Sequence, residues 1–202
     1  MKFPVILADP PWPYRNYKAA VHGAASSSYS TMSLGDICGL PVAEWADDDC
    51  ACFLWCTAPQ EAQGCHLDVL DAWGFRPVTR AFSWVKTYRH GGLYMGFGRY
   101  TRSGIESVWL GVRGRITKAL KNRDTREVLL APVARHSQKP EEVQDRIEGL
   151  LDGPYLELFA TRERPGWTCW GLGTGFRLDA RGVHAYNPDD GQAAGEETIN
   201  VP

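Results

Sequence analysis

Four consecutive residues near the start of the chain, Asp9-Pro10-Pro11-Trp12, place a carboxylate, two prolines and an aromatic ring directly after the apolar run 3–8. The run predicts a short buried strand, and ligands of open α/β sheets bind at the carboxyl ends of strands. Prolines cannot continue a helix or pair within a sheet, so we expect a rigid turn with outward-pointing carbonyls.

The chemistry of this turn suits a planar ligand that carries an amino group, such as a nucleobase. The Asp9 carboxylate and the Pro10 carbonyl can accept hydrogen bonds from an exocyclic amine, and Trp12 can stack on a flat ring. Four residues alone leave a second interpretation open, in which the turn is only stiff and its tryptophan is packed in the core.

Two further segments carry cations and aromatic rings of the kind that contact bases and phosphates. Residues 13–28 follow the turn directly, contain Tyr14 and show no periodicity, so they predict a loop beside the site. Residues 87–103 combine Arg99 and Arg102 with tyrosines and glycines in a second long loop. Loops without function are also polar and glycine-rich, so position beside the site is what favours substrate contact.

Charge is divided unevenly along a chain whose formal net charge is only −2. Residues 76–146 contain 15 lysines and arginines against 6 aspartates and glutamates, whereas the remainder contains 7 against 18. A basic middle is typical of a phosphate-binding surface, and equally of solvated helix faces.

Composition indicates one soluble domain. The 202 residues are 44% hydrophobic and 23% charged, without a segment long enough to span a bilayer or an N-terminal signal pattern, so we expect a cytoplasmic protein. Alternation over residues 50–56 puts three of the six cysteines on one buried face. No Cys-x-x-Cys pair is present and His66 is an isolated candidate ligand, so we expect free core thiols, no metal and no disulfide.

The pattern of elements predicts an α/β fold with a mostly parallel sheet covered by helices on both faces. Strands are expected at 3–8, 51–56, 76–86, 107–112, 128–131 and 155–160. Helices are expected after a Ser33 cap, over 57–73 and from about 135 to 151, and 113–126 predicts a surface helix or hairpin. Residues 174–202 are expected to form a loosely packed tail after a domain spanning 1–173.

Lys139 is unusual because it lies at the expected start of the last helix, where negative charge is favoured. A lysine at that position is explained if it holds a carboxylate ligand together with the free N–H groups of the helix.

Taken together, these motifs resemble the MT-A type of N6-adenine methyltransferase, a permuted family that includes the catalytic subunit of mRNA adenosine methyltransferase. The resemblance covers roughly residues 5–171. Its motifs follow in the family's order: Asp9-Pro10-Pro11-Trp12, Tyr29-Ser30-Thr31-Met32-Ser33, Phe53-Leu54-Trp55, Trp84-Val85-Lys86-Thr87, Leu110-Gly111-Val112-Arg113-Gly114, His136-Ser137-Gln138-Lys139-Pro140-Glu141-Glu142, Glu157-Leu158-Phe159-Ala160 and Gly166-Trp167-Thr168-Cys169-Trp170-Gly171.

The resemblance implies a Rossmann-like class I methyltransferase domain that uses S-adenosyl-L-methionine. It places the catalytic function on Asp9, Pro10, Pro11 and Trp12, with Lys139 holding the methionine carboxylate. The cofactor-binding residues that it implies are Asp9, Ser137, Lys139, Phe159, Thr161, Arg162 and Glu163. Trp12, Tyr14, Tyr29, Arg99 and Arg102 are expected to contact a nucleic acid whose target base is flipped out of the helix.

Two positions depart from the family pattern. Leu172 stands where the family has an asparagine that would bind ribose, and Thr161 stands where arginine is frequent, with Arg162 adjacent. We expect methylation of adenine N6 in DNA, because compact bacterial and phage relatives generally act on DNA. RNA methylation and a non-catalytic support subunit are the alternatives, and family members often act as homodimers or heterodimers.

Overall fold

The computed structural model describes residues 1–13, 31–98, 100–134, 138–171, 176–179 and 182–185. Within them, a seven-stranded sheet has the order β5-β3-β4-β2-β1-β6-β7. The strands of this sheet are β1 (Phe3–Ala8), β2 (Ala46–Cys56), β3 (Arg76–Thr87), β4 (Ile105–Arg113), β5 (Val128–Pro132), β6 (Tyr155–Leu158) and β7 (Trp167–Trp170).

The strand β1 lies inside the sheet, with β2 on one side and β6 on the other, both parallel to it. Only β4 among the seven strands runs in the opposite direction, because it pairs antiparallel with both β2 and β3. The expectation of a mostly parallel α/β sheet is therefore confirmed. This topology gathers the carboxyl ends of β1, β6 and β3 at one edge, where the functional residues lie.

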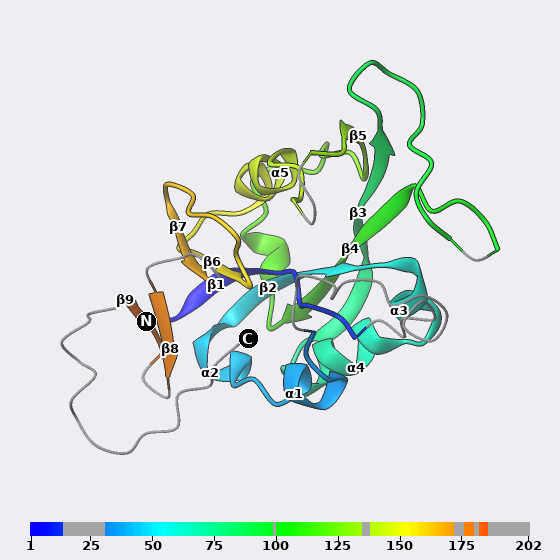
Figure 1. Ribbon diagram of the computed structural model, residues 1–202. Helices are drawn as coiled ribbons and strands as arrows, with labels where there is room; N and C mark the ends of the chain where they lie inside the picture. The colour runs from blue at the N-terminus through cyan, green and yellow to red at the C-terminus, as the bar shows by residue number, and fades with distance from the viewer. Residues whose placement is uncertain (14–30, 99, 135–137, 172–175, 180–181, 186–202) are drawn as a thin grey trace.

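Helices cover both faces of the sheet, as Figure 1 shows. The helices α1 (Leu34–Cys38), α2 (Val42–Trp45), α3 (Ala58–Ala62) and α4 (Cys65–Ala72) lie on one face. The helix α5 (Glu142–Leu150) lies on the other. Each face has its own buried apolar cluster, and Ile37 and Leu70 belong to the first whereas Val143 and Ile147 belong to the second.

The alternation of β2 divides its side chains between the two clusters. Cys50, Cys52 and Cys56 face the first cluster, and Phe53 and Trp55 face the second. All six cysteines are free, and burial raises the pKa of the Cys52 thiol well above its ordinary value. These thiols therefore act as small hydrophobic core residues, as the sequence pattern predicted.

Several element boundaries differ from the sequence predictions. The segment expected to be one helix over 57–73 is divided into α3 and α4, because Gly64 has a positive φ of 74° that breaks the helical path. The short helix α2 and the first five residues of β2 were not predicted. The basic segment 113–126 forms neither a helix nor a hairpin, and its regular structure is limited to one 3₁₀ turn, Ile116–Lys118.

The last helix begins later than predicted, at Glu142, so Lys139 and Pro140 precede it rather than form its first turn. In the expected tail, β8 (Phe176–Asp179) and β9 (Gly182–Ala185) pair as an antiparallel hairpin. Among the described residues, no helix is both long and apolar enough to cross a membrane, and no cluster of histidine, cysteine and acidic residues could hold a metal.

Candidate active site

The turn after β1 is fixed by backbone hydrogen bonds to neighbouring segments. The Asp9 N–H donates to the Leu158 carbonyl of β6 at 3.3 Å, and the Met32 N–H donates to the Pro11 carbonyl at 3.0 Å. The Pro10 carbonyl accepts from the Trp12 N–H at 2.8 Å, which closes the turn on itself. Asp9 is therefore held at the carboxyl end of β1, an inner strand of the sheet, as its sequence position predicted.

The Trp12 ring lies in the core. It is 2% exposed, and its Nε1 donates to the Trp55 carbonyl of β2 at 3.0 Å. The packed-tryptophan interpretation therefore describes its position in this structure, and Trp12 anchors the turn to the sheet. A role for its ring in stacking on a base remains a prediction.

Four alternating charges meet above the ends of β1, β3 and β4. The Lys139 ammonium lies 2.6 Å from Asp9 Oδ2 and 3.5 Å from Glu106 Oε2. The other Glu106 oxygen lies 2.5 Å from Lys86 Nζ. Lys139 also lies over the Trp55 ring, 5.4 Å from its centroid. Asp9 and Lys139 were both predicted as site residues, and the structure brings them together although they lie 130 positions apart in the chain.

The two carboxylates of this cluster have opposite pKa shifts. Burial raises the pKa of Asp9 above its ordinary value, and the attraction of Lys139 only partly offsets that effect. Burial also raises the pKa of Glu106, but Lys139 and Lys86 outweigh it and leave that pKa below its ordinary value. Glu106 is therefore the more firmly ionised of the pair, because it has two cationic neighbours.

A pocket opens beside this cluster between β1, β6 and the start of α5. Its lining includes both polar and apolar side chains, and it comprises Leu7, Asp9, Trp55, Gln138, Lys139, Pro140, Val143, Gln144, Glu157, Phe159, Thr161 and Arg162. Four of the predicted cofactor residues besides Asp9 thus line one cavity: Lys139, Phe159, Thr161 and Arg162. Glu163 is exposed in the adjoining loop and does not line it.

The floor of the pocket contains a residue with a strained backbone. Phe159 has a φ of 64°, a left-handed conformation that a bulky residue rarely adopts. Its ring packs against Trp170 with centroids 5.2 Å apart, and the Ala160 N–H donates to the Trp170 carbonyl at 2.9 Å. Such strain persists where the surroundings enforce it, and it concentrates at ligand sites.

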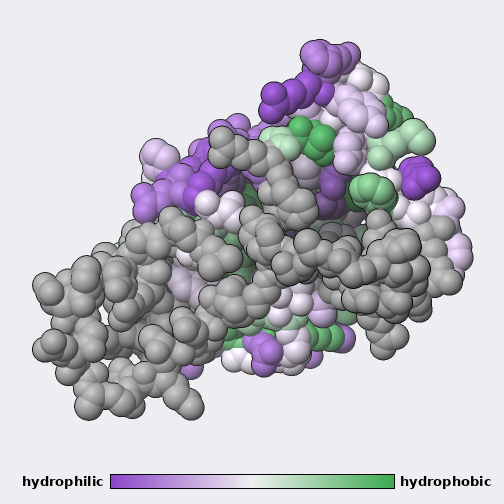
Figure 2. Space-filling view, viewed as in Figure 1, coloured by the Kyte–Doolittle hydropathy of each residue, from purple (hydrophilic) through white to green (hydrophobic). Residues whose placement is uncertain are grey.

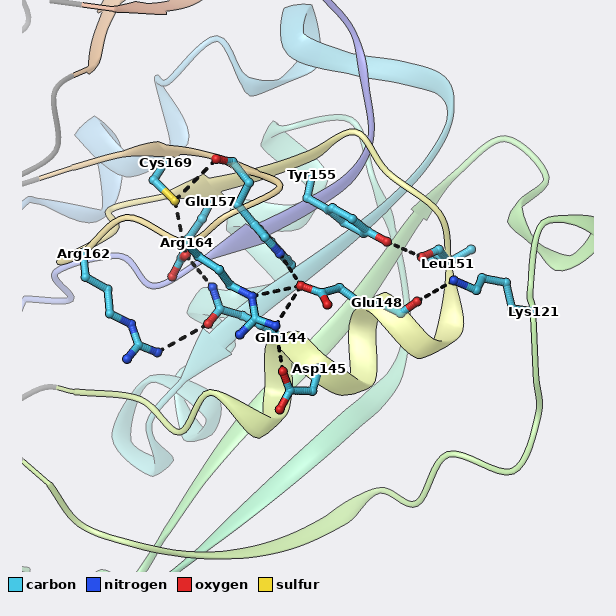
Figure 3. Close-up of polar contacts among 11 residues, drawn as sticks. Lys121, Gln144, Asp145, Glu148, Leu151, Tyr155, Glu157, Arg162, Arg164 and Cys169 are labelled. Carbon is cyan, nitrogen blue, oxygen red and sulfur yellow. Dashed lines mark hydrogen bonds and ion pairs between the residues drawn. The ribbon is translucent and has the colours of Figure 1, made fainter.

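The loop that follows Phe159 is held against α5 by ion pairs, as Figure 3 shows. Arg164 contacts Asp145 at 2.6 Å and Glu148 at 2.8 Å. Arg162 pairs with Glu141, the residue before α5. These contacts fix the rim of the pocket on the helix that begins just after Lys139.

A second predicted contact region, residues 87–104, projects from the sheet between β3 and β4 (Figure 1). Four of its large hydrophobic side chains are 66–90% exposed: Leu93, Met95, Phe97 and Tyr100. Figure 2 shows apolar and polar side chains interleaved over this projecting part of the molecule. Arg102, which lies in the same segment, is also exposed.

Four predicted site residues, Tyr14, Tyr29, Arg99 and Ser137, lie outside the described residues. The sequence motifs predicted no role for Glu106, Gln144 or Glu157, which the structure places in or beside the cavity. A signal was present for Glu157, because a carboxylate at the centre of an otherwise apolar strand requires a partner or a ligand.

Comparison with known proteins agrees with this geometry. The model of the family described as MT-A70 matches residues 3–173. The chain belongs to the MT-A70 family. It is 34% identical over 188 residues to the Type II methyltransferase M.MunI of Mycoplasma sp, an alignment that covers 85% of this chain and 77% of that relative.

Larger MT-A70 relatives match over only part of their length. The N(6)-adenine-specific methyltransferase METTL4 of Homo sapiens is 30% identical, with 84% of this chain and 37% of the relative covered. The N(6)-adenosine-methyltransferase catalytic subunit METTL3 of Homo sapiens is 30% identical, with 93% and 30% covered. Membership confirms the predicted enzyme class, an N6-adenine methyltransferase, and its methyl donor, S-adenosyl-L-methionine.

Proposed function

We propose that this chain transfers a methyl group from S-adenosyl-L-methionine to the N6 amine of adenine in DNA, with Asp9 as the residue that binds the amine. The observation that supports the proposal is the Asp9 carboxylate at the carboxyl end of β1, 2.6 Å from Lys139 and on the wall of a cavity. A family match over residues 3–173 supports the reaction.

The residues of the cavity fit the cofactor chemically. The donor carries one carboxylate and two positive charges, on its ammonium and its sulfonium. Lys139 supplies a cation for the carboxylate, and the Asp9 carboxylate supplies a counter-charge. Phe159 and Val143 add apolar surface for the remainder of the molecule. The bound cofactor supplies an electrophilic methyl group.

The protein's part in the reaction is to orient a weakly nucleophilic amine. The lone pair of adenine N6 is delocalised into the ring, and hydrogen bonds from its N–H groups favour the pyramidal geometry in which it can attack. A carboxylate has two oxygens, so Asp9 can accept from the amine with one while Lys139 contacts the other. The Pro10 carbonyl already accepts from Trp12 and has a second lone pair for the amine. Positioning and a matched field then lower the barrier.

DNA is favoured as substrate because the relative that aligns over most of both chains is named a Type II methyltransferase. RNA is the second candidate, since the name of METTL3 describes an adenosine methyltransferase. The loops 13–28 and 87–104 are the segments expected to contact either nucleic acid. Assembly into homodimers or heterodimers is a further prediction, which sedimentation of the purified chain tests.

The test of this proposal is an assay with labelled S-adenosylmethionine on unmethylated DNA and on RNA, followed by mass spectrometry of the nucleosides. The expected product is N6-methyldeoxyadenosine. N6-methyladenosine from RNA alone would retain the chemistry and replace the substrate. Absence of any product, with no binding of the cofactor, would favour a support subunit instead.

The Asp9→Asn variant tests the assigned residue. It keeps the shape of the side chain and removes its charge, so we expect methylation to fall by roughly 100-fold or more, while far-ultraviolet circular dichroism stays that of the folded protein. Turnover close to that of the wild type would remove Asp9 from the mechanism.

A further inference from the structure

Glu157 is a partly buried acid that the proposed reaction does not use. It lies at the centre of β6, where its backbone is in register with Leu7 of β1 and Cys169 of β7. The side chains before and after it, Leu156 and Leu158, are fully buried on the opposite face. Burial of an acid within the sheet carries a cost unless something compensates for its charge.

The partners of Glu157 in the protein supply little compensation. Gln144 of α5 donates from Nε2 to Glu157 Oε2 at 2.7 Å, and the Cys169 thiol lies 3.9 Å away (Figure 3). Gln144 is itself only 4% exposed, and its Oε1 accepts from Arg162 at 3.5 Å. An amide and a thiol are neutral, so the negative charge of Glu157 has no direct cationic contact among these hydrogen bonds.

The position of Glu157 is on the wall of the cavity that holds Asp9 and Lys139. We propose that the Glu157 carboxylate is a counter-charge for the positive charge of the methyl donor, that Gln144 positions it, and that the pair makes the cavity favour donor over product. The inference rests on the proposed function. Loss of the methyl group removes the sulfonium charge, so S-adenosylhomocysteine carries one positive charge fewer than S-adenosylmethionine.

The protonation of Glu157 gives this preference a pH dependence. Burial raises the pKa of Glu157 to about 7, with repulsion by Asp9 adding to it and attraction by Arg162 and Arg164 opposing it. Gln144 from α5 and Cys169 from β7 are the other groups that contact the carboxylate. Above about pH 7 the carboxylate is ionised and attracts the donor, whereas below that pH it is neutral and discriminates less.

The experiment measures dissociation constants of S-adenosylmethionine and S-adenosylhomocysteine by calorimetry at about pH 6 and about pH 8. The readout is the ratio of the two constants, product over donor. In the wild-type protein this ratio is expected to rise with pH. In Glu157→Gln it is expected to be roughly tenfold lower at the higher pH and independent of pH, because a charge-assisted contact is lost.

Two further variants complete the design. Gln144→Met keeps the size of the side chain and removes its N–H donor, which shifts the midpoint of the pH dependence upward because the ionised form loses its hydrogen bond. Glu142→Gln is the control, because Glu142 is an acid of the same helix whose partner is Arg146 and not Glu157. Its ratio of dissociation constants is expected to match that of the wild type.

Equal weakening of both ligands in Glu157→Gln, with the ratio unchanged, would assign Glu157 a structural role and overturn the inference. If Glu157→Gln does not fold, Gln144→Met becomes the deciding measurement. An unchanged midpoint of the pH dependence in that variant would also overturn the inference. If the wild-type protein bound neither ligand and formed no methylated product, the proposed function would be wrong instead.

Discussion

The individual residues of the site form a balanced set of partly buried charges. Two acids, Asp9 and Glu106, alternate with two lysines, Lys86 and Lys139, at separations of 2.5–3.5 Å. All four side chains are 16–26% exposed. Removing one charge from such a set lowers stability by more than the ion pair itself contributes, because the partner charge is left uncompensated.

Glu106 is the member shared by both lysines, so its substitution tests this balance. Glu106→Gln removes the carboxylate that both ammonium groups contact, so Lys86 loses its ion-pair partner and Lys139 keeps Asp9. We expect the free energy of unfolding to fall by about 3 kcal/mol. Urea denaturation measures the change. The double variant Lys86→Met with Glu106→Leu removes both charges and is expected to recover most of the loss. If the single substitution had no effect on the denaturation midpoint, the charge cluster would be unimportant for stability.

Glu157 links ligand binding to stability through its pKa. The pKa is about 7 in the folded chain against an ordinary value of 4.5, so the folded state binds this proton more tightly than the unfolded state. Its contribution to stability is therefore fully present below about pH 4.5 and is lost as the pH rises through about 7. We expect Glu157→Gln, compared with the wild type, to gain up to ~3 kcal/mol between about pH 5 and pH 8. Denaturation curves of both proteins at each pH measure it, and a pH-independent difference would contradict the assignment.

At the level of elements, the sequence predicted those whose apolar period is strong and whose ends carry clear signals. The strand 3–8 matches β1, and the Ser33 cap matches α1, where Ser33 and Asp36 form a capping box. The misses have physical causes. Two helices replace one at Gly64 because a single positive φ outweighs a continuous apolar stripe. The last helix starts at Glu142, so Pro140 precedes it instead of lying in its first turn.

The candidate site was predictable only in part, because local motifs identify some of its residues and the strand order brings in the others. Asp9 and Lys139 belong to local motifs that carry their own signal. Glu106, Gln144 and Glu157 acquire their importance from the strand order, which places β4, α5 and β6 around the end of β1. Pairing between distant strands cannot be read from short-range periodicity.

The contact between the end of β7 and the strained Phe159 turn gives a prediction about an element. A Cβ at Gly171 would lie 2.3 Å from the Ala160 carbonyl oxygen and 2.6 Å from the Phe159 carbonyl carbon. Both atoms are backbone, so Gly171→Ala is expected to displace the pocket floor, to destabilise the protein by about 2 kcal/mol and to weaken cofactor binding. Thermal unfolding and calorimetry report the two effects. Gly35→Ala, whose Cβ would meet nothing closer than 3.7 Å, is the control, and equal behaviour of the two variants would show that the close approach is relaxed.

Across the whole molecule, the cofactor cavity and the arm formed by residues 87–104 are separate features on one scaffold. The cavity lies at the ends of β1 and β6, whereas the arm extends from β3 and β4 and exposes aromatic side chains. Exposed rings beside cations are typical of surfaces on which bases stack. Cofactor binding and nucleic-acid binding are therefore expected to be separable by mutation.

The double variant Phe97→Ala with Tyr100→Ala tests that separation. Both side chains are almost fully exposed, at 87% and 90%, so their loss leaves the core intact. Stacking contributes about 1–3 kcal/mol per base, and we expect DNA affinity to fall by roughly tenfold or more while the dissociation constant for S-adenosylmethionine is unchanged. Fluorescence anisotropy with a labelled oligonucleotide measures the first and calorimetry the second. Leu67→Ala, an exposed apolar residue on α4, is expected to change neither. Wild-type DNA affinity in the double variant would move the nucleic-acid surface away from the arm, whereas loss of cofactor affinity would show that arm and cavity are coupled.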